Sequence, residues 1–388
     1  MPKTALFSLG FRPFFLGAAI FAVVSMALWM GVYVFQWPLN MIGISSFQWH
    51  AHEMIYGFTM AVIAGFLLTA VKNWTGVQTL YRFDLLGLFI LWILARVLFL
   101  FGTSLIFIAG FFDIFFILAL ISSIIYPIVK ARQSKQLGII VILVFLGVAN
   151  SSFYLGVAGF IDHGVFFGIY GGLFLIVGLV LLMGRRVIPF FIEAGVGYPV
   201  KILNSKWLDI SIIMLYIAFL IAQIFIVNQW IISLISMSLF LTNSARLASW
   251  HTVGIWRKPL LWSLFVAFIF INLGFLLMAL NIFMNLPNIV VIHAFSFGGI
   301  GVITLSMMAR VTLGHTGRNV QNPPKAVTAS LVILIAGAVV RVILPLIMQN
   351  HYVIWVAISQ ILWIAAFLIF IFTYWPMLVK PRVDGQFG

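Results

Sequence analysis

The sequence predicts an all-α membrane protein, a polytopic bundle of about twelve transmembrane helices. Two observations lead to this fold class: 64% of the 388 residues are hydrophobic, and only 7% are charged. A soluble domain has about 25% charged residues. Irregular backbone is not tolerated against lipid, so the spans should all be helices. We expect residues 1–388 to form a single integral membrane domain within a lipid bilayer.

Apolar runs divide the chain into the expected spans, each needing about 20 mostly apolar residues. The first run is longer than the apolar core of a secretory leader, about 7–15 residues, and we interpret it as a span. Proline and glycine between 185 and 207 predict the longest loop. The expected spans are 13–36, 48–71, 84–101, 104–129, 137–156, 164–184, 208–228, 230–250, 259–281, 288–312, 327–348 and 352–378.

The basic residues predict the orientation. With the N-terminus in the cytoplasm, every lysine and arginine outside the expected spans falls in an inner segment, and the outer loops hold none. Cytoplasmic loops carry such an excess of basic residues. We therefore expect both termini in the cytoplasm. This distribution also accounts for the net charge of +14 without nucleic-acid binding.

Cysteine is absent from the chain. Disulfides, thiolate metal ligands, covalently attached c-type haem and cysteine-held iron–sulfur clusters are therefore excluded. A metal centre in this protein must use histidine, methionine, tyrosine, carboxylate or backbone ligands.

Ionisable side chains gather at one depth within the expected spans. A rise of about 1.5 Å per residue places three histidines, two arginines and two carboxylates in the outer part of the bilayer. Isolated charges are costly in lipid, so these groups should pair with each other or with a charged cofactor. They are His50, His52, Glu53, Arg96, Asp113, His293 and Arg341.

This combination predicts a haem site, most simply of the b type. Neutral imidazoles bind haem iron, and arginine forks bind carboxylates such as the haem propionates. We expect His52 and His293 as axial ligands and Arg96 and Arg341 near the propionates. His50 is a further candidate metal ligand, but residues two apart on a regular helix point about 200° from each other. Hydrogen-bonded packing histidines and a structural arginine–aspartate pair are the alternatives.

A second polar group is expected at the opposite end of the spans. Its tryptophans and basic residues are typical of interfacial anchors. An anion site or a second cofactor site is the other interpretation. The group consists of Lys72-Asn-Trp-Thr-Gly76, Arg246, Trp250-His251, Arg310 and His315-Thr-Gly-Arg318.

Several long motifs, spread over most of the chain, resemble the NnrS family. The resemblance implies a bacterial inner-membrane protein of twelve helices that binds haem and copper and acts in nitric oxide metabolism or nitrosative-stress defence. The motifs are Phe11-Arg-Pro-Phe-Phe15, Trp49-His-Ala-His-Glu-Met54, Asn73-Trp-Thr-Gly76, Arg186-Val-Ile-Pro-Phe-Phe191, His293-Ala-Phe295 and Met308-Ala-Arg310-Val-Thr-Leu-Gly-His315-Thr-Gly-Arg318.

The chain departs from this family pattern at two positions. Tyr154 and Phe265 stand where relatives often have histidine, so copper is the less secure of the two implied cofactors. We expect a haem protein with nitric oxide or a similar small molecule as its ligand. A proton-coupled secondary transporter is the alternative, because buried arginine, aspartate and histidine are typical of such carriers. A purely structural or assembly partner is a third interpretation.

The topology is testable with reporter fusions. Fusions after Pro38, Asp162 and Asn285 should report the outside, and fusions after Arg132 and Lys325 should report the cytoplasm. The reason is the confinement of basic residues to one set of loops. An inside signal at Asp162 would contradict the twelve-span arrangement.

Overall fold

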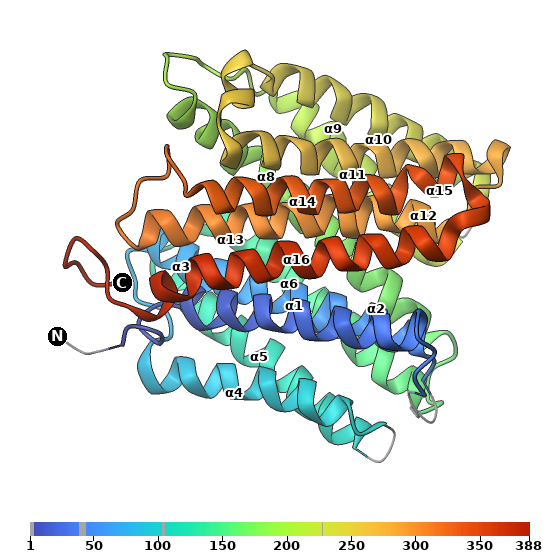
Figure 1. The fold of residues 1–388 in the computed structure, drawn as a ribbon, viewed down its shortest axis with the longest axis horizontal. Helices are drawn as coiled ribbons and strands as arrows, with labels where there is room; N and C mark the ends of the chain where they lie inside the picture. Colours follow the sequence, from blue (N-terminus) through green and yellow to red (C-terminus); the bar gives the residue numbers. More distant parts are fainter. Residues whose placement is uncertain (1–3, 39–43, 103–104, 227) are drawn as a thin grey trace. The chain divides into compact units, whose positions relative to one another are not determined.

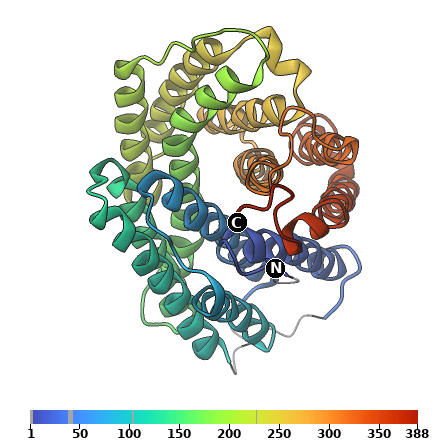
Figure 2. The same cartoon turned by 90° about the vertical axis from the view of Figure 1, so that its left-hand side faces the viewer.

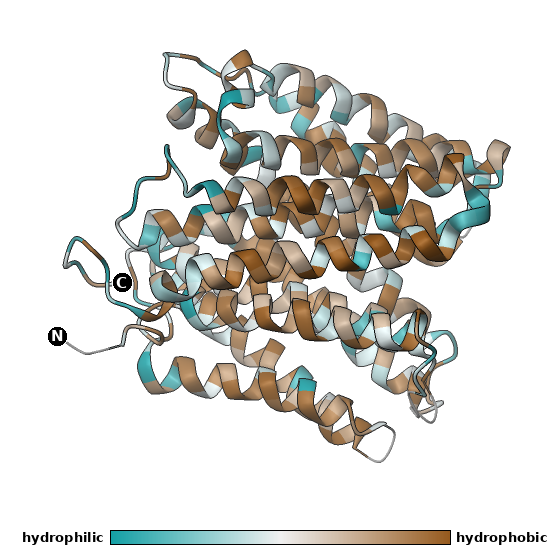
Figure 3. Cartoon of the chain, in the orientation of Figure 1, coloured by the Kyte–Doolittle hydropathy of each residue, from teal (hydrophilic) through white to brown (hydrophobic). Residues whose placement is uncertain are grey.

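The computed structural model describes residues 4–38, 44–102, 105–226 and 228–388. Within these ranges every regular element is a helix (Figure 1). Among the described residues, eleven helical segments are long and apolar enough to cross a membrane. The remaining expected span, 84–101, corresponds to α4 (Arg82–Phe99), which carries three charged residues. Apolar residues run along most of each helix, and polar ones concentrate near the connections (Figure 3). The protein is therefore an all-α, multi-pass membrane protein, as the sequence predicts.

The chain divides into two compact units, and each is described by itself. Unit 1 contains residues 1–173, 308–319 and 367–388. Unit 2 contains residues 174–307 and 320–366. Both units are thus assembled from segments that are distant in the sequence.

In unit 1, α4 packs along α5, α5 along α6, and α1 along α3 (Figure 1). These pairs enclose the polar network described below. The helices that lie wholly in unit 1 are α1 (Phe11–Tyr33), α2 (Ser46–His52), α3 (Met60–Thr75), α4, α5 (Ile106–Lys130), α6 (Leu137–Val157) and α7 (Gly164–Phe166).

In unit 2, α9 packs along α10 and α10 along α11; Figure 2 shows many of the helices close to end on. Three helices, α8, α13 and α16, begin in one unit and end in the other. The remaining helices are α8 (Gly172–Gly195), α9 (Lys206–Ile221), α10 (Gln229–Trp250), α11 (Pro259–Met284), α12 (Asn288–His293), α13 (Val302–His315), α14 (Lys325–Val342), α15 (Leu344–Ile347) and α16 (Tyr352–Val379).

Several helix ends follow directly from the local sequence. Ser45 caps α2 and forms a capping box with Gln48, which satisfies amide groups that a helix start leaves free. The Asn228 side chain accepts hydrogen bonds from two amides at the start of α10. Gly76 ends α3 with a φ of 70°, a left-handed conformation that glycine adopts without strain.

In the part of the chain that the structure describes, four spans contain a π-helical stretch, which the sequence did not predict. Glu53–Thr59 follows α2, and Ala294–Gly301 follows α12. Each begins directly after a histidine that the sequence singles out, His52 or His293. π-Helical turns are rare and often lie at functional sites. The other two stretches are Phe167–Gly171 and Ala222–Ile226.

The prediction of a loop over residues 185–207 is wrong in its first half. Residues 185–195 continue α8, with Pro189 inside the helix. Ile188 and Ile192 lie one turn apart and are both buried, at 3% and 1% exposure, so tertiary packing holds this face in helical form. The chain turns only afterwards, at Gly197, whose φ is 84°.

Arg12 fastens the end of α16 within unit 1. Its side chain is fully buried. Nη1 donates to the main-chain oxygens of Met377, Leu378 and Lys380 at 3.0, 2.8 and 2.8 Å, and Nη2 donates to that of Gly388 at 2.6 Å. A helix end leaves its last carbonyls without partners, and a cation there also favours the negative end of the helix dipole. Arg12 therefore closes α16 in a way that no neutral side chain can reproduce.

The segment after α16 is held by a surface ion pair. Arg382 binds both carboxylate oxygens of Asp384, at 2.9 and 2.5 Å, and donates to the main-chain oxygen of His315 at 3.1 Å. The hydrogen bonds from Arg382 lower the pKa of Asp384 to about 2. The pair therefore stays ionised at physiological pH.

Replacing Arg12 tests its role. Arg12→Leu should destabilise the purified protein by about 3 kcal/mol, because buried carbonyls lose charge-assisted hydrogen bonds. Thermal unfolding in detergent measures the change. Arg132→Gln, which removes an exposed charge of the same unit, is the control and should change stability little. Equal unfolding temperatures for both variants would show that Arg12 does not hold α16.

Candidate functional site

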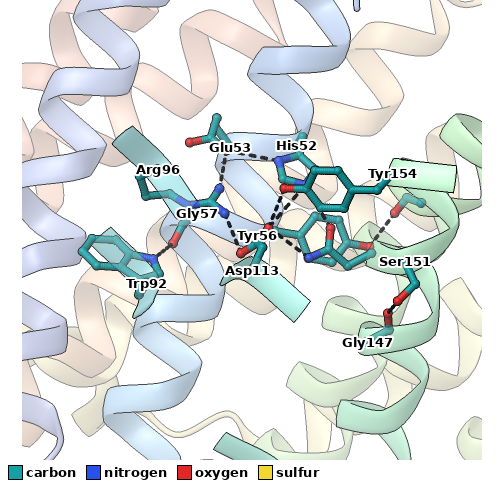
Figure 4. A network of polar contacts seen from close by, with 12 residues as sticks. His52, Glu53, Tyr56, Gly57, Trp92, Arg96, Asp113, Gly147, Ser151 and Tyr154 are labelled. Carbon is teal, nitrogen blue, oxygen red and sulfur yellow. Dashed lines mark hydrogen bonds and ion pairs between the residues drawn. The ribbon is translucent and has the colours of Figure 1, made fainter. Parts of the chain in front are cut away.

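Unit 1 contains an ionic network buried among its helices (Figure 4). Arg96 of α4 lies between two carboxylates. Its Nη1 contacts Glu53, directly after α2, and its Nη2 lies 2.5 Å from Asp113 Oδ1 on α5. The three side chains are only 4%, 1% and 0% exposed. Buried charges require such pairing, because an uncompensated charge in this environment is strongly destabilising.

Asp113 has further hydrogen bonds from α6. Asn150 Nδ2 and the Tyr154 hydroxyl each donate to Asp113 Oδ2 at 3.0 Å. Together with Arg96, these donors occupy both carboxylate oxygens. Asp113 is therefore held by donors from two other helices, α4 and α6.

His52 connects the two carboxylate positions. Its Nε2 lies 2.9 Å from Asn150 Oδ1, and its Nδ1 lies 3.1 Å from Glu53 Oε1. Because the amide nitrogen of Asn150 already donates to Asp113, its oxygen must accept, and Nε2 must carry a proton. One further proton then lies between Nδ1 and Glu53. The network of Arg96, Asp113, Glu53 and His52 is electrically neutral whichever of the two partners holds that proton.

The surroundings of His52 are aromatic and closed. The His52 side chain is fully buried, and its ring lies 4.7 Å from the Phe99 ring and 4.3 Å from the Phe153 ring, measured between centroids. The Tyr56 ring is 5.0 Å away, one turn further along the chain. His52 is thus fixed by packing as well as by hydrogen bonds, and its ring has little freedom to turn.

The π-helical stretch after His52 brings Arg96 into place. The main-chain oxygen of Gly57 accepts a hydrogen bond from Trp92 Nε1 at 2.9 Å. A Cβ atom at this glycine would meet Arg96 Cδ at 3.1 Å and the Phe21 ring at 2.6 Å. Glycine at position 57 therefore allows α4 to approach the π-helical stretch closely. Trp92 and Arg96, which make this contact, lie one turn apart on α4.

The sequence located part of this network. The helical rise predicted that Glu53, Arg96 and Asp113 lie at one depth in the bilayer. It also suggested the Arg96–Asp113 ion pair, which is present. It did not find Asn150 or the role of Tyr154. The available signal was Asn150 and Tyr154, two polar residues one turn apart near the end of a largely apolar span.

His50 lies outside the network. Its ring stacks on Trp29 of α1, with centroids 4.6 Å apart and planes inclined by 9°. His50 and His52 therefore face different neighbours, as the 200° angle between them predicts.

Unit 2 contains the other predicted pair. His293 ends α12, and its Nδ1 lies 2.6 Å from the main-chain oxygen of Ile289, one turn earlier. A carbonyl only accepts, so Nδ1 carries the proton and Nε2 presents a lone pair. Arg341 Nη2 of α14 lies 3.3 Å from that Nε2, and Arg341 Nη1 donates to the Tyr352 hydroxyl at 3.0 Å. Arg341 is 7% exposed.

The structure thus groups the predicted residues in two sets. His52, Glu53, Arg96 and Asp113 meet in unit 1, and His293 meets Arg341 in unit 2. The pairing of His52 and His293 on one iron stays a prediction. Within the described ranges, no three histidine or carboxylate side chains are arranged as a metal-binding group.

The second polar group also divides between the units. His315 lies 3.4 Å from Asn73, between Nε2 and Nδ2, and its ring is 5.7 Å from that of Phe11 in unit 1. Arg246 and Trp250 belong to unit 2, where the guanidinium carbon lies 5.6 Å from the indole centroid.

Fold and site together define a multi-pass α-helical membrane protein with a compensated ionic network buried among its spans. The family model described as NnrS protein matches residues 5–382 of the 388. The chain therefore belongs to the NnrS family, a haem- and metal-related family linked to the nitric oxide response. Among curated proteins, none matches this chain.

The ionic network predicts a compensating double variant. Arg96→Met should destabilise unit 1 by about 3–5 kcal/mol, because it leaves buried carboxylates without their cation. Adding Glu53→Gln should restore part of this loss, since one negative charge is then removed as well. Thermal unfolding of both variants provides the measurement. A double variant that is less stable than Arg96→Met alone would contradict the proposed charge balance.

Proposed function

We propose that this protein is an NnrS-like haem-binding protein of the bacterial inner membrane that acts in the nitric oxide response. Two facts support the proposal: the family to which the chain belongs, and the state of His293 in unit 2. The bound ligand is nitric oxide or a similar small molecule. Nitric oxide is small and dissolves in lipid, so a haem buried among membrane helices needs no polar access route.

His293 meets the chemical requirement for an axial ligand. A metal-binding imidazole typically donates its other ring N–H to a carbonyl or carboxylate, which sets the tautomer and the ring orientation. The Nδ1 contact with the Ile289 oxygen, at 2.6 Å, is of this kind. The ligating group would be Nε2, which in this structure faces Arg341 Nη2 at 3.3 Å, so iron binding would replace that contact. This tautomer is the observation on which the proposal mainly rests.

Arg341 meets the requirement for a propionate partner. Among the described residues, Arg341 forms no ion pair and has only neutral hydrogen-bond partners, Tyr352 and His293. A buried guanidinium is stabilised by a carboxylate, which it binds through two parallel hydrogen bonds. Bound haem would supply an iron that takes diatomic ligands, and Arg341 would hold and orient its propionate.

The residues of unit 1 fit a haem less readily. The partners of the His52 ring nitrogens, Asn150 and Glu53, belong to the buried ionic network themselves, and Arg96 is already paired with two carboxylates. Iron binding at His52 would require one of its two hydrogen bonds to break. The assignments of His52 and His50 as ligands, and of Arg96 as a propionate partner, stay predictions.

A second candidate function rests on the network of unit 1. Intramembrane carboxylate and histidine groups are typical of proton pathways in carriers. A proton-coupled secondary transporter would use the proton held between His52 and Glu53. This candidate needs no haem, so the absorption spectrum of the purified protein separates the two.

The axial ligand is tested by histidine replacement. The purified protein should show a haem spectrum, and His293→Ala should remove it or convert it to a different spin state, because Nε2 of this residue is the proposed ligand. His52→Ala tests the remaining prediction in the same measurement. His315→Ala and the exposed His351→Ala serve as controls and should leave the spectrum unchanged.

Two results would contradict the proposal. A colourless protein purified in native-like lipid would contradict haem binding and favour the carrier. An unchanged haem spectrum in His293→Ala would show that unit 2 does not supply the ligand.

A further inference from the structure

A second charged cluster lies in unit 2, where α8, α9 and α10 meet. Asp209, in the first turn of α9, accepts a hydrogen bond from Arg246 Nη2 of α10 at 2.7 Å. Arg185 Nη1 of α8 lies 3.4 Å from the other carboxylate oxygen of Asp209. Two arginines therefore share one carboxylate. Glu193, the single acidic residue of α8, is engaged elsewhere, because its Oε1 accepts from the Ile202 amide at 2.8 Å.

The cluster has unused hydrogen-bond donors as well as excess charge. Arg246 Nη1 and Arg185 Nε are buried and have no hydrogen-bond partner among the described residues. The Arg246 side chain is only 3% exposed. Buried polar groups without partners are rare and costly, and each requires an explanation. An oxyanion would give such donors an acceptor and cancel the remaining positive charge.

The helices that carry Asp209 and Arg246 are largely exposed on the surface of the protein. Only 22% of the membrane-spanning window of the α9 span and of α10 is buried inside the protein. Trp207 and Leu203, shortly before Asp209 in the chain, are 78% and 74% exposed. Exposed tryptophan next to basic residues is typical of the membrane–water interface. Lipid phosphates occupy this depth.

We propose that Arg185 and Arg246 form a binding site for a phosphate oxyanion, supplied by the headgroup of an anionic phospholipid. Basic pockets between transmembrane helices bind such headgroups. Asp209 orients both guanidinium groups, since it engages one nitrogen of each and leaves others for the ligand. The site is independent of haem binding, because no residue of the proposed haem site takes part.

The binding test uses the delipidated full-length protein in neutral detergent. Phosphatidylglycerol, phosphatidylcholine and inorganic phosphate are added separately, and binding is followed by native mass spectrometry and by thermal unfolding. We expect phosphatidylglycerol to bind and to raise the unfolding temperature, and phosphatidylcholine to do neither. Stabilisation by inorganic phosphate as well would assign the site to a free oxyanion. No effect of either anion would overturn the proposal.

Matched variants locate the site. Arg185→Gln should weaken phosphatidylglycerol binding by about tenfold, the loss expected for one charge-assisted hydrogen bond. Lys201→Gln removes an exposed charge from the neighbouring loop and should leave binding nearly unchanged. Arg185→Lys keeps the charge without the fork and should fall between them. Equal weakening by Lys201→Gln would indicate general surface attraction and overturn the assigned site.

Discussion

Charge compensation around Arg96 is the constraint on which unit 1 depends. A guanidinium that is 4% exposed must have its countercharges within the same apolar interior, and Glu53 and Asp113 supply them from two other spans. The two carboxylates have further hydrogen-bond partners. Asn150 and Tyr154 bind Asp113, and His52 contacts Glu53. Four helical spans are thereby held in one register. Apolar packing alone specifies less well which helix faces meet, because every face of an apolar membrane helix can pack against lipid or protein.

The two histidines that the sequence singled out have different chemical states. His52 and His293 both lie directly before a π-helical stretch, where the chain departs from regular helical geometry. His52 has both ring nitrogens in use, one of them beside a carboxylate. His293 has one nitrogen on a carbonyl and the other facing a guanidinium. The first arrangement suits a held proton, and the second suits ligation of a metal by a neutral imidazole.

The arginines differ in the same way. Arg12 binds main-chain carbonyls at the end of a helix, and Arg96 binds two carboxylates. Arg246 binds one carboxylate, which it shares with Arg185. Among the described residues, Arg341 contacts only neutral groups. A buried guanidinium seeks a countercharge, which Arg96 has from two carboxylates and which several carbonyl oxygens replace at Arg12. Arg246 and Arg341 are the positions at which an anionic ligand would improve the balance, in agreement with the two ligand sites proposed for unit 2.

The sequence by itself determined the all-α membrane fold, nearly all of the spans and the residues that carry charge within them, because hydropathy and helical rise are local properties of the chain. It also carried the NnrS motifs. Only the tertiary structure decided that α8 continues to Gly195, that π-helical turns follow both histidines, and that Asn150 and Tyr154 complete the network. The reason is that partner choice depends on which faces of distant spans meet. A local pattern gives the depth of a side chain but not the neighbour that it contacts.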